Sequence, residues 1–221
     1  MPCQDYCAFH RAGLADAYGT IGKYNLFMAC ETPDPGAFRA LPEGYSFRLC
    51  RRGEVETWKR LVAEEQYVAY VTDFYEKVYA KNEDEFFRRC TFVCAAGDKP
   101  VASAFLWRAH GEIDTVGWFR VLPVYEGLGL GRALLSEILK PAKGPVYLHT
   151  QPTSIRAIKL YSDLGFALIT NPVIGYRKND LAESLPYMQK VMPAATYENL
   201  RFIEIGDSLH QAALLSETAE F

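Results

Sequence analysis

The fold is decided by residues 118–135, which read WFRVLPVYEGLGLGRALL. The first residues belong to a predicted β-strand that stops at Pro123, and an apolar run with a helical period follows the glycines. Gly127, Gly129 and Gly131 stand between the two. Glycines leave the backbone uncovered, so successive amide N–H groups can converge on phosphate oxygens, and a helix N-terminus adds partial positive charge. The segment therefore predicts a diphosphate-binding turn between a strand and a helix.

Three alternatives to this interpretation have different residue requirements. A P-loop requires a Gly-Lys-Ser/Thr sequence, and the glycines here are not followed by one. A dinucleotide-binding fold requires an acidic residue at the end of the next strand, whereas the predicted strand 146–150, VYLHT, ends without one. A strand-to-helix corner without a ligand needs one left-handed residue rather than three alternating glycines. Diphosphate binding is favoured, and the class of nucleotide stays open.

The remaining pattern predicts a mixed α/β fold. Strands are predicted at 45–49, 91–96, 100–109, 113–122, 146–150, 166–169, 187–192 and 200–205. Helices are predicted at 54–65, 72–80, 83–89, 129–140 and 154–164, with a last one from Asp207 or Ser208 to Leu215. Because three strands follow one another between residues 91 and 122, we expect a mixed sheet rather than a purely parallel one.

Length and composition are those of a folded protein. The chain has 221 residues, of which 49% are apolar and 23% charged, and this excludes wholesale disorder. The stretch 32–36, TPDPG, is a strong turn or linker signal. We therefore expect residues 1–44 to form an N-terminal extension packed on a domain that spans 45–192, and residues 193–221 to form a C-terminal extension.

Charge, hydropathy and cysteines limit the partners. A net charge of −3 argues against a nucleic-acid surface, and no apolar run approaches the length of a membrane span. The first residues, MPCQDYCAFH, lack the regions of a secretory signal, so we expect a cytoplasmic protein whose six cysteines are reduced. The cluster Cys3, Cys7 and His10 fits zinc spacing poorly, and no metal is predicted, although a fourth ligand from elsewhere would keep that question open.

A second motif supplies the class of nucleotide. Residues 157–166, AIKLYSDLGF, predict a helix whose Tyr161 lies just before a glycine stop and a strand. With the glycine turn about 30 residues earlier, the chain resembles the GNAT superfamily of acetyl-CoA-dependent N-acetyltransferases. The family motif A-x-x-L-Y-x-x-x-G-F is matched without a gap. The phosphate motif Q/R-x-x-G-x-G/A is matched at Gly129 and Gly131, with Glu126 in place of glutamine or arginine.

The resemblance covers about 45–192 and implies a fold. It predicts a mixed, mostly antiparallel sheet that is splayed at its centre and has helices on both faces. Residues 187–192 resemble the closing strand of the family, and Ser154 stands where the family commonly has an asparagine three residues before the alanine of the second motif.

The resemblance also implies acetyl-CoA as the cosubstrate. In such proteins the pantetheine arm enters the gap between two diverging strands and hydrogen-bonds to the first, as an added strand would. The positions that match, with Ser154 as a further cofactor residue, are Phe119, Arg120 and Val121 for the arm, and Gly127, Leu128, Gly129, Leu130, Gly131 and Arg132 for the pyrophosphate. Glu126 brings a carboxylate close to a negative ligand and is expected to lower the affinity.

Acetyl transfer requires a neutral amine and a proton for the departing thiolate. Tyr161 stands where the family places the acid, and a phenol with a pKa of about 10 can protonate a thiolate whose thiol has a pKa near 8.5. For the base, His149 titrates near neutrality, while Asp114 and Glu112 compete with it. The alternatives are a tyrosine that packs under the cofactor, a structural histidine, solvated strand-end acids and a water relay.

Aromatic residues in the helical segment 67–87 provide a candidate wall for the acceptor. Tyr70/Phe74 and Tyr75/Tyr79 are i,i+4 pairs on two different faces. One face is expected to be core. The other could bind an amine by cation–π contact, with packing alone as the alternative.

These observations predict an N-acetyltransferase that moves an acetyl group from acetyl-CoA to a primary amine by direct transfer in a ternary complex. Transfer of a longer acyl group is one alternative. A non-catalytic acyl-CoA-binding module is another, in which Glu126 and Ser154 mark a degenerate site. The acceptor, whether small molecule or peptide, and the oligomeric state, a homodimer included, stay open.

Overall fold

The computed structural model describes residues 21–206 and residue 220. Contacts divide these residues into two compact units: 32–146 with residue 220, here the first unit, and 21–31 with 147–206, here the second unit. Both units combine helices with mostly antiparallel strands, which confirms the predicted mixed α/β class. The predicted boundaries at 44 and 192 and the splay of the sheet stay predictions.

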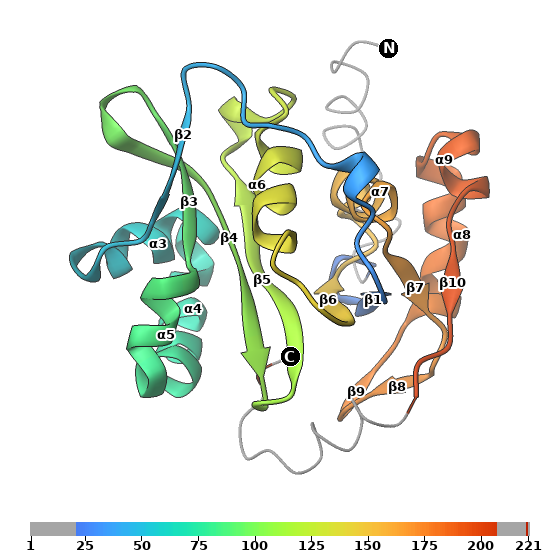
Figure 1. The fold of residues 1–221 in the computed structure, drawn as a ribbon. Helices are drawn as coiled ribbons and strands as arrows, with labels where there is room; N and C mark the ends of the chain where they lie inside the picture. Colours follow the sequence, from blue (N-terminus) through green and yellow to red (C-terminus); the bar gives the residue numbers. More distant parts are fainter. Residues whose placement is uncertain (1–20, 207–219, 221) are drawn as a thin grey trace. The chain divides into compact units, whose positions relative to one another are not determined.

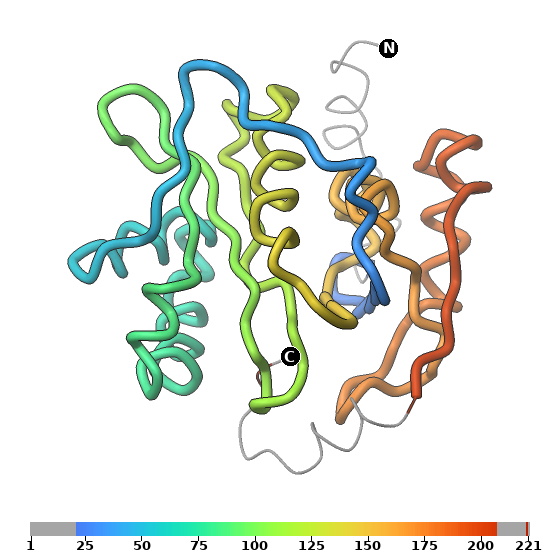
Figure 2. The backbone as a smooth tube through the Cα atoms, in the orientation of Figure 1, coloured from blue at the N-terminus to red at the C-terminus, as the bar shows by residue number. Residues whose placement is uncertain are grey.

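The strands of the first unit lie in the order β5-β4-β3-β2, and each pair is antiparallel. Their bounds are β2 Ser46–Leu49, β3 Thr91–Ala95, β4 Lys99–Ala109 and β5 Ile113–Val121. Figure 2 shows β4 and β5 running side by side as a long hairpin. These strands match four of the predicted segments to within two residues at each end.

A bulge interrupts the β4–β5 ladder. Ser103 lies opposite Arg120 and Phe105 opposite Gly117, so β5 has one more residue than β4 between these pairs. Trp118 lies in the bulge with a φ of 47°. A Cβ atom at Gly117 would lie 3.0 Å from the Phe105 ring, so the ring occupies the space that a side chain would need.

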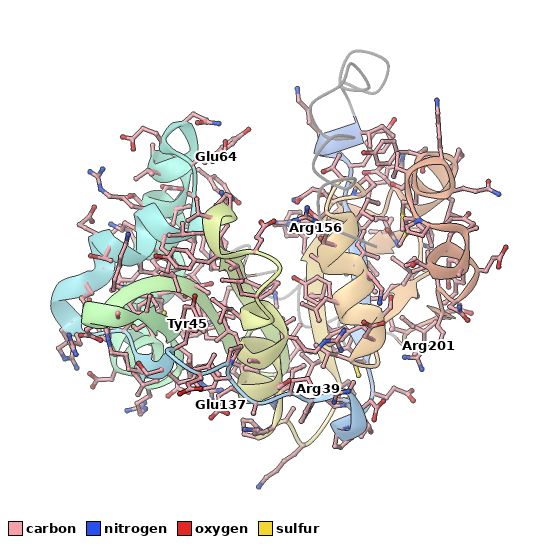
Figure 3. All side chains as sticks on the ribbon, turned by 90° about the horizontal axis from the view of Figure 1, so that it is seen from above. Arg39, Tyr45, Glu64, Glu137, Arg156 and Arg201 are labelled. Atoms are coloured by element: carbon pink, nitrogen blue, oxygen red, sulfur yellow. The ribbon has the colours of Figure 1, made fainter. Side chains whose placement is uncertain are left out.

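Helices cover both sides of these strands (Figures 1 and 3). The helices of the first unit are α3 Val55–Val62, α4 Val68–Phe74, α5 Glu83–Arg89 and α6 Leu130–Leu139, and a π-helical turn, Tyr75–Tyr79, continues α4. In Figure 3, Glu64 beyond α3 and Glu137 on α6 lie on opposite sides of the strands. The arrangement follows from strand alternation, because successive side chains of a strand point to opposite faces.

The core of the first unit is an aromatic cluster around Trp58, which is fully buried. Its ring lies 5.0–6.3 Å from the rings of Tyr75, Tyr79, Phe86, Phe105 and Trp118. Tilted and edge-to-face pairs at these distances each add about 1 kcal/mol beyond area burial. Glu220 joins this unit, since its Oε2 accepts hydrogen bonds from Trp107 Nε1 at 3.0 Å and from the His110 amide at 3.1 Å.

The second unit has strands in the order β10-β7-β1-β6. Their bounds are β1 Leu26–Cys30, β6 Val146–Thr150, β7 Ala167–Ile169 and β10 Phe202–Ile203, and a separate hairpin joins β8 Val173–Ile174 to β9 Arg177–Lys178. β1 pairs antiparallel with β7, and β10 pairs parallel with β7. All five residues of β1 are buried, so the sequence carries no period-two alternation there and did not indicate a strand.

The helices of the second unit are α7 Ile155–Asp163, α8 Leu181–Val191 and α9 Ala194–Glu198. The predicted strand at 187–192 is wrong, because these residues belong mainly to α8. Leu181, Ser184 and Met188 are buried at helical spacing. A six-residue segment such as 187–192 is too short for its pattern to distinguish a strand from a helix, and the buried positions upstream of it show the helical spacing.

Some predictions lie outside the described residues: the helix ending at Leu215 and the cluster Cys3, Cys7 and His10. The described cysteines, Cys30, Cys50, Cys90 and Cys94, are buried, and the structure shows no disulfide among them. Within residues 21–206 and 220, every helix is too short or too polar to cross a bilayer.

Candidate active site

The glycine turn has the backbone that its sequence predicts. A 3₁₀ turn, Pro123–Tyr125, follows β5, and Gly129 is the N-cap of α6. Gly127 and Gly129 have φ angles of 80° and 82°, in the left-handed region where a side chain costs roughly 1–2 kcal/mol. Glycine is therefore favoured at both positions by the backbone conformation.

The amides of this turn face no acceptor in the described part of the chain. Tyr125 and Glu126 donate to Leu122 and Pro123 carbonyls at 2.8 and 3.2 Å, and Ala133 donates to the Gly129 carbonyl at 3.1 Å. Among residues 21–206 and 220, the structure shows no hydrogen bond from the amides of 127–131. The first N–H groups of a helix lack intrahelical partners, and with the helix dipole they form an anion site.

Arg132, in the first turn of α6, lies against the segment that precedes β2. Its Nη1 is 3.5 Å from the Ala37 carbonyl oxygen. One turn further along α6, Ser136 Oγ accepts a hydrogen bond from the Arg39 amide at 3.0 Å. The neighbouring Glu126 is exposed. The guanidinium of Arg132 is thus held near the turn by the chain at 37–39.

The predicted pantetheine positions, Phe119, Arg120 and Val121, are half-buried residues at the end of β5. Their strand uses one edge for β4, with Arg120 opposite Ser103 and Val121 opposite Ala102. The edge toward β4 is therefore not available to a ligand at Arg120 and Val121.

Tyr161 lies on α7 in the second unit and is 6% exposed. Its ring packs against Phe166 with centroids 5.9 Å apart. Burial raises the pKa of Tyr161 well above the ordinary value for a phenol. The hydroxyl therefore holds its proton throughout the physiological range. Ser154, the N-cap residue of α7, is half-buried, and its carbonyl accepts the Ile158 amide at 2.9 Å.

His149, on β6, is part of a polar chain that the sequence did not indicate. Its Nε2 lies 2.9 Å from Asn25 Oδ1, and its ring lies 5.1 Å from the Phe27 ring. Burial, with the positive charge of Arg177 as a smaller cause, lowers the pKa of His149 to about 4. With the amide oxygen as acceptor, Nε2 carries the hydrogen and Nδ1 keeps the lone pair. His149 is thus neutral at pH 7.

Asp114 is paired at the far end of β5. Its Oδ1 lies 3.3 Å from Arg108 Nη1, directly across the hairpin. Seven residues of strand separate Asp114 from Val121, or about 20 Å. Glu112 lies in the exposed turn before β5. These positions argue against Asp114 or Glu112 as the general base for a reaction near Val121.

The aromatic segment divides into two faces as predicted. Tyr75 and Tyr79 are 3% and 2% exposed and belong to the core, whereas Tyr70 is 56% exposed. Tyr70 and Phe74 contact each other and the ring of Trp118, which lies just before the predicted pantetheine positions. Trp118 was not indicated by the sequence, because only the bulge gives its side chain this position.

A model of the acetyltransferase (GNAT) family matches residues 55–166, about half of the chain. The chain belongs to this family. The matched range of this GNAT protein contains both the glycine turn and the AIKLYSDLGF motif. Members of this family are acetyltransferases, so the prediction that the protein is an acyltransferase is confirmed.

Similar proteins are known in several bacteria. The GNAT protein is 43% identical over 56 residues to the N-alpha-acetyltransferase RimI of Mycobacterium tuberculosis (strain ATCC 25618 / H37Rv), a match that covers 25% of this chain and 34% of that protein. A GCN5-related N-acetyltransferase from Sphaerobacter thermophilus is 16% identical, with a TM-score of 0.48 over 72% of this chain and 54% of that one. A functionally unknown conserved protein from Staphylococcus epidermidis ATCC 12228 is 14% identical, with a TM-score of 0.48 over 65% and 57%. The GNAT protein thus spans about a third of the curated relative and little more than half of the two solved structures.

Metal ligands do not gather in the described part of this GNAT protein. Residues 21–206 and 220 contain no group of three or more histidine, cysteine, aspartate or glutamate side chains that could hold an ion.

Proposed function

We propose that this protein transfers an acetyl group from acetyl-CoA to a primary amine by direct transfer in a ternary complex. The observation that carries the proposal is the glycine turn, where the amides of 127–131 lack acceptors in the described chain and Gly127 and Gly129 are left-handed. Membership of an acetyltransferase family suggests that the ligand of this turn is acetyl-CoA.

The residues of the first unit fit the cosubstrate. Amides at 127–131 and the guanidinium of Arg132 would hold the pyrophosphate, because both are donors suited to phosphate oxygens. The backbone at 119–121 would hold the pantetheine arm as an added strand. Glu126 would weaken the binding through its negative charge.

The second unit supplies the proposed proton transfers. As the amine nitrogen forms a bond to the thioester carbon and the carbon–sulfur bond breaks, Tyr161 would donate its phenolic proton to the departing thiolate. Its raised pKa keeps the phenol protonated before the reaction, but it also makes Tyr161 a weaker acid toward the thiolate. Ser154, at the start of the same helix, stays a proposed cofactor residue.

For the base, His149 has the better support. Its Nδ1 lone pair is available at neutral pH because Nε2 is committed to Asn25. A pKa of about 4 makes it a weak base. It would therefore accept the proton of the amine during attack rather than deprotonate a free ammonium ion. Asp114 stays a proposal with less support, because its carboxylate pairs with Arg108.

Membership of the family predicts an amine as the acceptor but does not identify which amine. The similarity over 56 residues to a protein named an N-alpha-acetyltransferase supports an α-amine as one form of acceptor. Transfer of a longer acyl group and a non-catalytic acyl-CoA-binding module stay the alternatives. A cytoplasmic location is part of the proposal and is supported by the thiols of Cys50, Cys90 and Cys94, which are buried and not in disulfides. A homodimer and the absence of nucleic-acid binding stay predictions.

One assay separates these proposals. The full chain is incubated with acetyl-CoA or butyryl-CoA and a panel of amines, and free thiol and acylated amine are quantified together. Equal amounts of CoA and acetylated amine support the proposed function. CoA binding by calorimetry without product on any amine indicates the binding module. Preference for butyryl-CoA indicates the longer acyl group, and failure to bind any acyl-CoA overturns the proposal.

A further inference from the structure

Two backbone irregularities of the first unit are joined by one hydrogen bond. Trp118 is a bulky residue with a φ of 47°, in a region that such residues rarely occupy. Tyr79 ends a π-helical turn, a rare geometry that is frequent at functional sites. The indole Nε1–H of Trp118 donates to the Tyr79 hydroxyl oxygen over 3.0 Å. The two irregular segments therefore hold each other.

The Tyr79 side of this bond is rigid. Tyr79 is 2% exposed, and its ring lies 4.8 Å from the Trp107 ring and 5.3–5.4 Å from the Phe86 and Phe105 rings. Burial raises the pKa of Tyr79 well above its ordinary value, so the hydroxyl is neutral and can accept the indole hydrogen. The core thus fixes the point to which the indole is tied.

The other side of Trp118 is an aromatic surface. Its ring lies 5.4 Å from Phe74 and 6.3 Å from Tyr70, and the last two lie 6.4 Å apart. Tyr70 is 56% exposed. We call Trp118, Tyr70 and Phe74 the aromatic triad. Strained conformations persist where the surrounding structure over-determines them, and they concentrate at ligand-binding sites.

The triad stands beside the proposed site of the thioester. Trp118 is followed directly by 119–121, and about 10 Å of strand separates it from Val121. This is the length of a small acceptor that reaches from the triad to the end of β5.

Charge selects among acceptors. Glu64 of the helical segment pairs with Arg120 at 3.8 Å, and Asp73 pairs with Lys77 at 2.7 Å. These two carboxylates already have cationic partners, so a polyamine would have to compete with Arg120 or Lys77 to bind them. The faces of the aromatic rings instead suit an acceptor with one ammonium group and a flat apolar skeleton.

We propose that the aromatic triad binds the acceptor, that Tyr79 is the residue that positions Trp118, and that the acceptor is a primary amine that carries an aromatic ring. This inference rests on the proposed function and names its acceptor class. 2-Phenylethylamine is the probe, with n-butylamine as the aliphatic amine of similar length and spermidine as the polyamine.

The first test compares two tyrosines. Tyr70→Leu removes an exposed ring of the triad, and Tyr67→Leu removes a ring that is 58% exposed and makes no ring contact in the described chain. We expect kcat/KM of the parent protein to be about tenfold higher for 2-phenylethylamine than for n-butylamine or spermidine. Tyr70→Leu is expected to remove most of this preference, and Tyr67→Leu to keep it.

The second test concerns positioning. Tyr79→Phe keeps the ring but removes the acceptor of the indole hydrogen bond. We expect KM for 2-phenylethylamine to rise about fivefold while KM for acetyl-CoA and kcat with n-butylamine stay unchanged. Trp118→Phe is expected to raise the same KM, and the double variant to add nothing further, because both changes remove one interaction.

The outcomes separate the two proposals. Turnover of 2-phenylethylamine that depends on Tyr70 and Tyr79 supports the inference. Turnover of all three amines with equal efficiency, or a preference for spermidine, overturns the inference and leaves the proposed function standing. Binding of acetyl-CoA without turnover of any amine, in the parent protein and in Tyr67→Leu alike, overturns the proposed function itself.

Discussion

Asn25 and Asp180 are joined by reciprocal hydrogen bonds although 155 residues separate them. The Asn25 amide donates to Asp180 Oδ2 at 2.9 Å, and the Asp180 amide donates to the Asn25 carbonyl at 2.9 Å. Burial would raise the pKa of Asp180, but hydrogen bonds from Lys178 and the Asn25 amide outweigh it and lower that pKa. The start of β1 is thereby tied to the start of α8, and the side chain of Asn25 is presented to His149.

Asn25→Ala tests the hydrogen bonds that connect Asp180, Asn25 and His149. The variant leaves Nε2–H of a largely buried His149 without its acceptor, which costs about 1–3 kcal/mol. We expect urea unfolding to show this loss at pH 7. Asn199→Ala is the control, because it removes an amide whose partner, the Ala195 carbonyl, is exposed, and its loss is expected to stay below about 0.5 kcal/mol. Equal losses of unfolding free energy in the two variants would show that the hydrogen bond between Asn25 and His149 does not stabilise the fold.

The pKa of His149 predicts a pH dependence of stability. The folded-state pKa of about 4 lies below the ordinary 6.5, so between these values the unfolded chain binds a proton that the folded chain does not. The contribution of neutral His149 is therefore complete above pH 6.5 and is lost as the pH falls through about 4, by up to about 3 kcal/mol.

His149→Gln isolates this contribution. Glutamine can still donate to Asn25 but does not titrate, so the variant is expected to lose less stability than the parent between pH 7 and pH 4.5. Urea unfolding of both proteins at the two pH values gives the difference. Parallel losses in parent and variant would show that His149 is not the group responsible.

Gly129→Ala tests the phosphate turn. The left-handed φ makes alanine unfavourable by roughly 1–2 kcal/mol, although its Cβ would meet only Pro42 Cγ at 3.7 Å. If the amides of the turn bind pyrophosphate, the Kd for CoA is expected to rise about tenfold, measured by calorimetry. Gly53→Ala is the matched control, since Gly53 has open space and no left-handed φ. An unchanged Kd in Gly129→Ala would place the pyrophosphate elsewhere.

Tyr161→Phe tests the proposed acid. The ring keeps its packing against Phe166, so thermal stability is expected to stay close to that of the parent. Loss of the phenolic proton is expected to lower kcat about a hundredfold while KM for acetyl-CoA changes little. Tyr147→Phe removes the hydroxyl of another buried tyrosine with a raised pKa and serves as the control. A kcat for Tyr161→Phe that equals that of the control would mean that water protonates the thiolate.

Glu54→Gln tests a stabilising ion pair of the first unit. Glu54 accepts two hydrogen bonds from Arg48 at 2.7 and 2.8 Å, and the two side chains are only 21% and 15% exposed. We expect a loss of about 1–2 kcal/mol on chemical unfolding. Asp73→Asn, whose pair with Lys77 is 59% and 63% exposed, is expected to change stability by less than about 0.5 kcal/mol. A reversed order would contradict the importance of burial for these pairs.

Local chemistry made much of the first unit predictable. The helix predicted at 129–140 is α6, and the strands predicted between 91 and 122 are β3, β4 and β5. Proline and glycine end these elements by their own backbone preferences, and half-buried strands carry alternation in the sequence. The glycine turn belongs to this class, because its geometry depends on neighbouring residues alone.

A segment that is buried on all sides lacks the alternation of polar and apolar residues from which a strand is predicted. β1 has no alternation to detect, and the segment 187–192 is too short to show by itself that it completes a helix. In both cases the contacts of distant residues decide the element. Short apolar segments adopt whichever structure their surroundings bury best.

The amino-acid sequence by itself determined the mixed α/β class, the backbone of the glycine turn and the family motif, since each depends on residues close together in the chain. Only the tertiary structure decided which side chains meet: His149 with Asn25 across 124 residues, and Trp118 with Tyr79 across 39. Hydrogen bonds between distant residues leave no periodic trace, because what selects them is the folded position of each partner and not the identity of its neighbours.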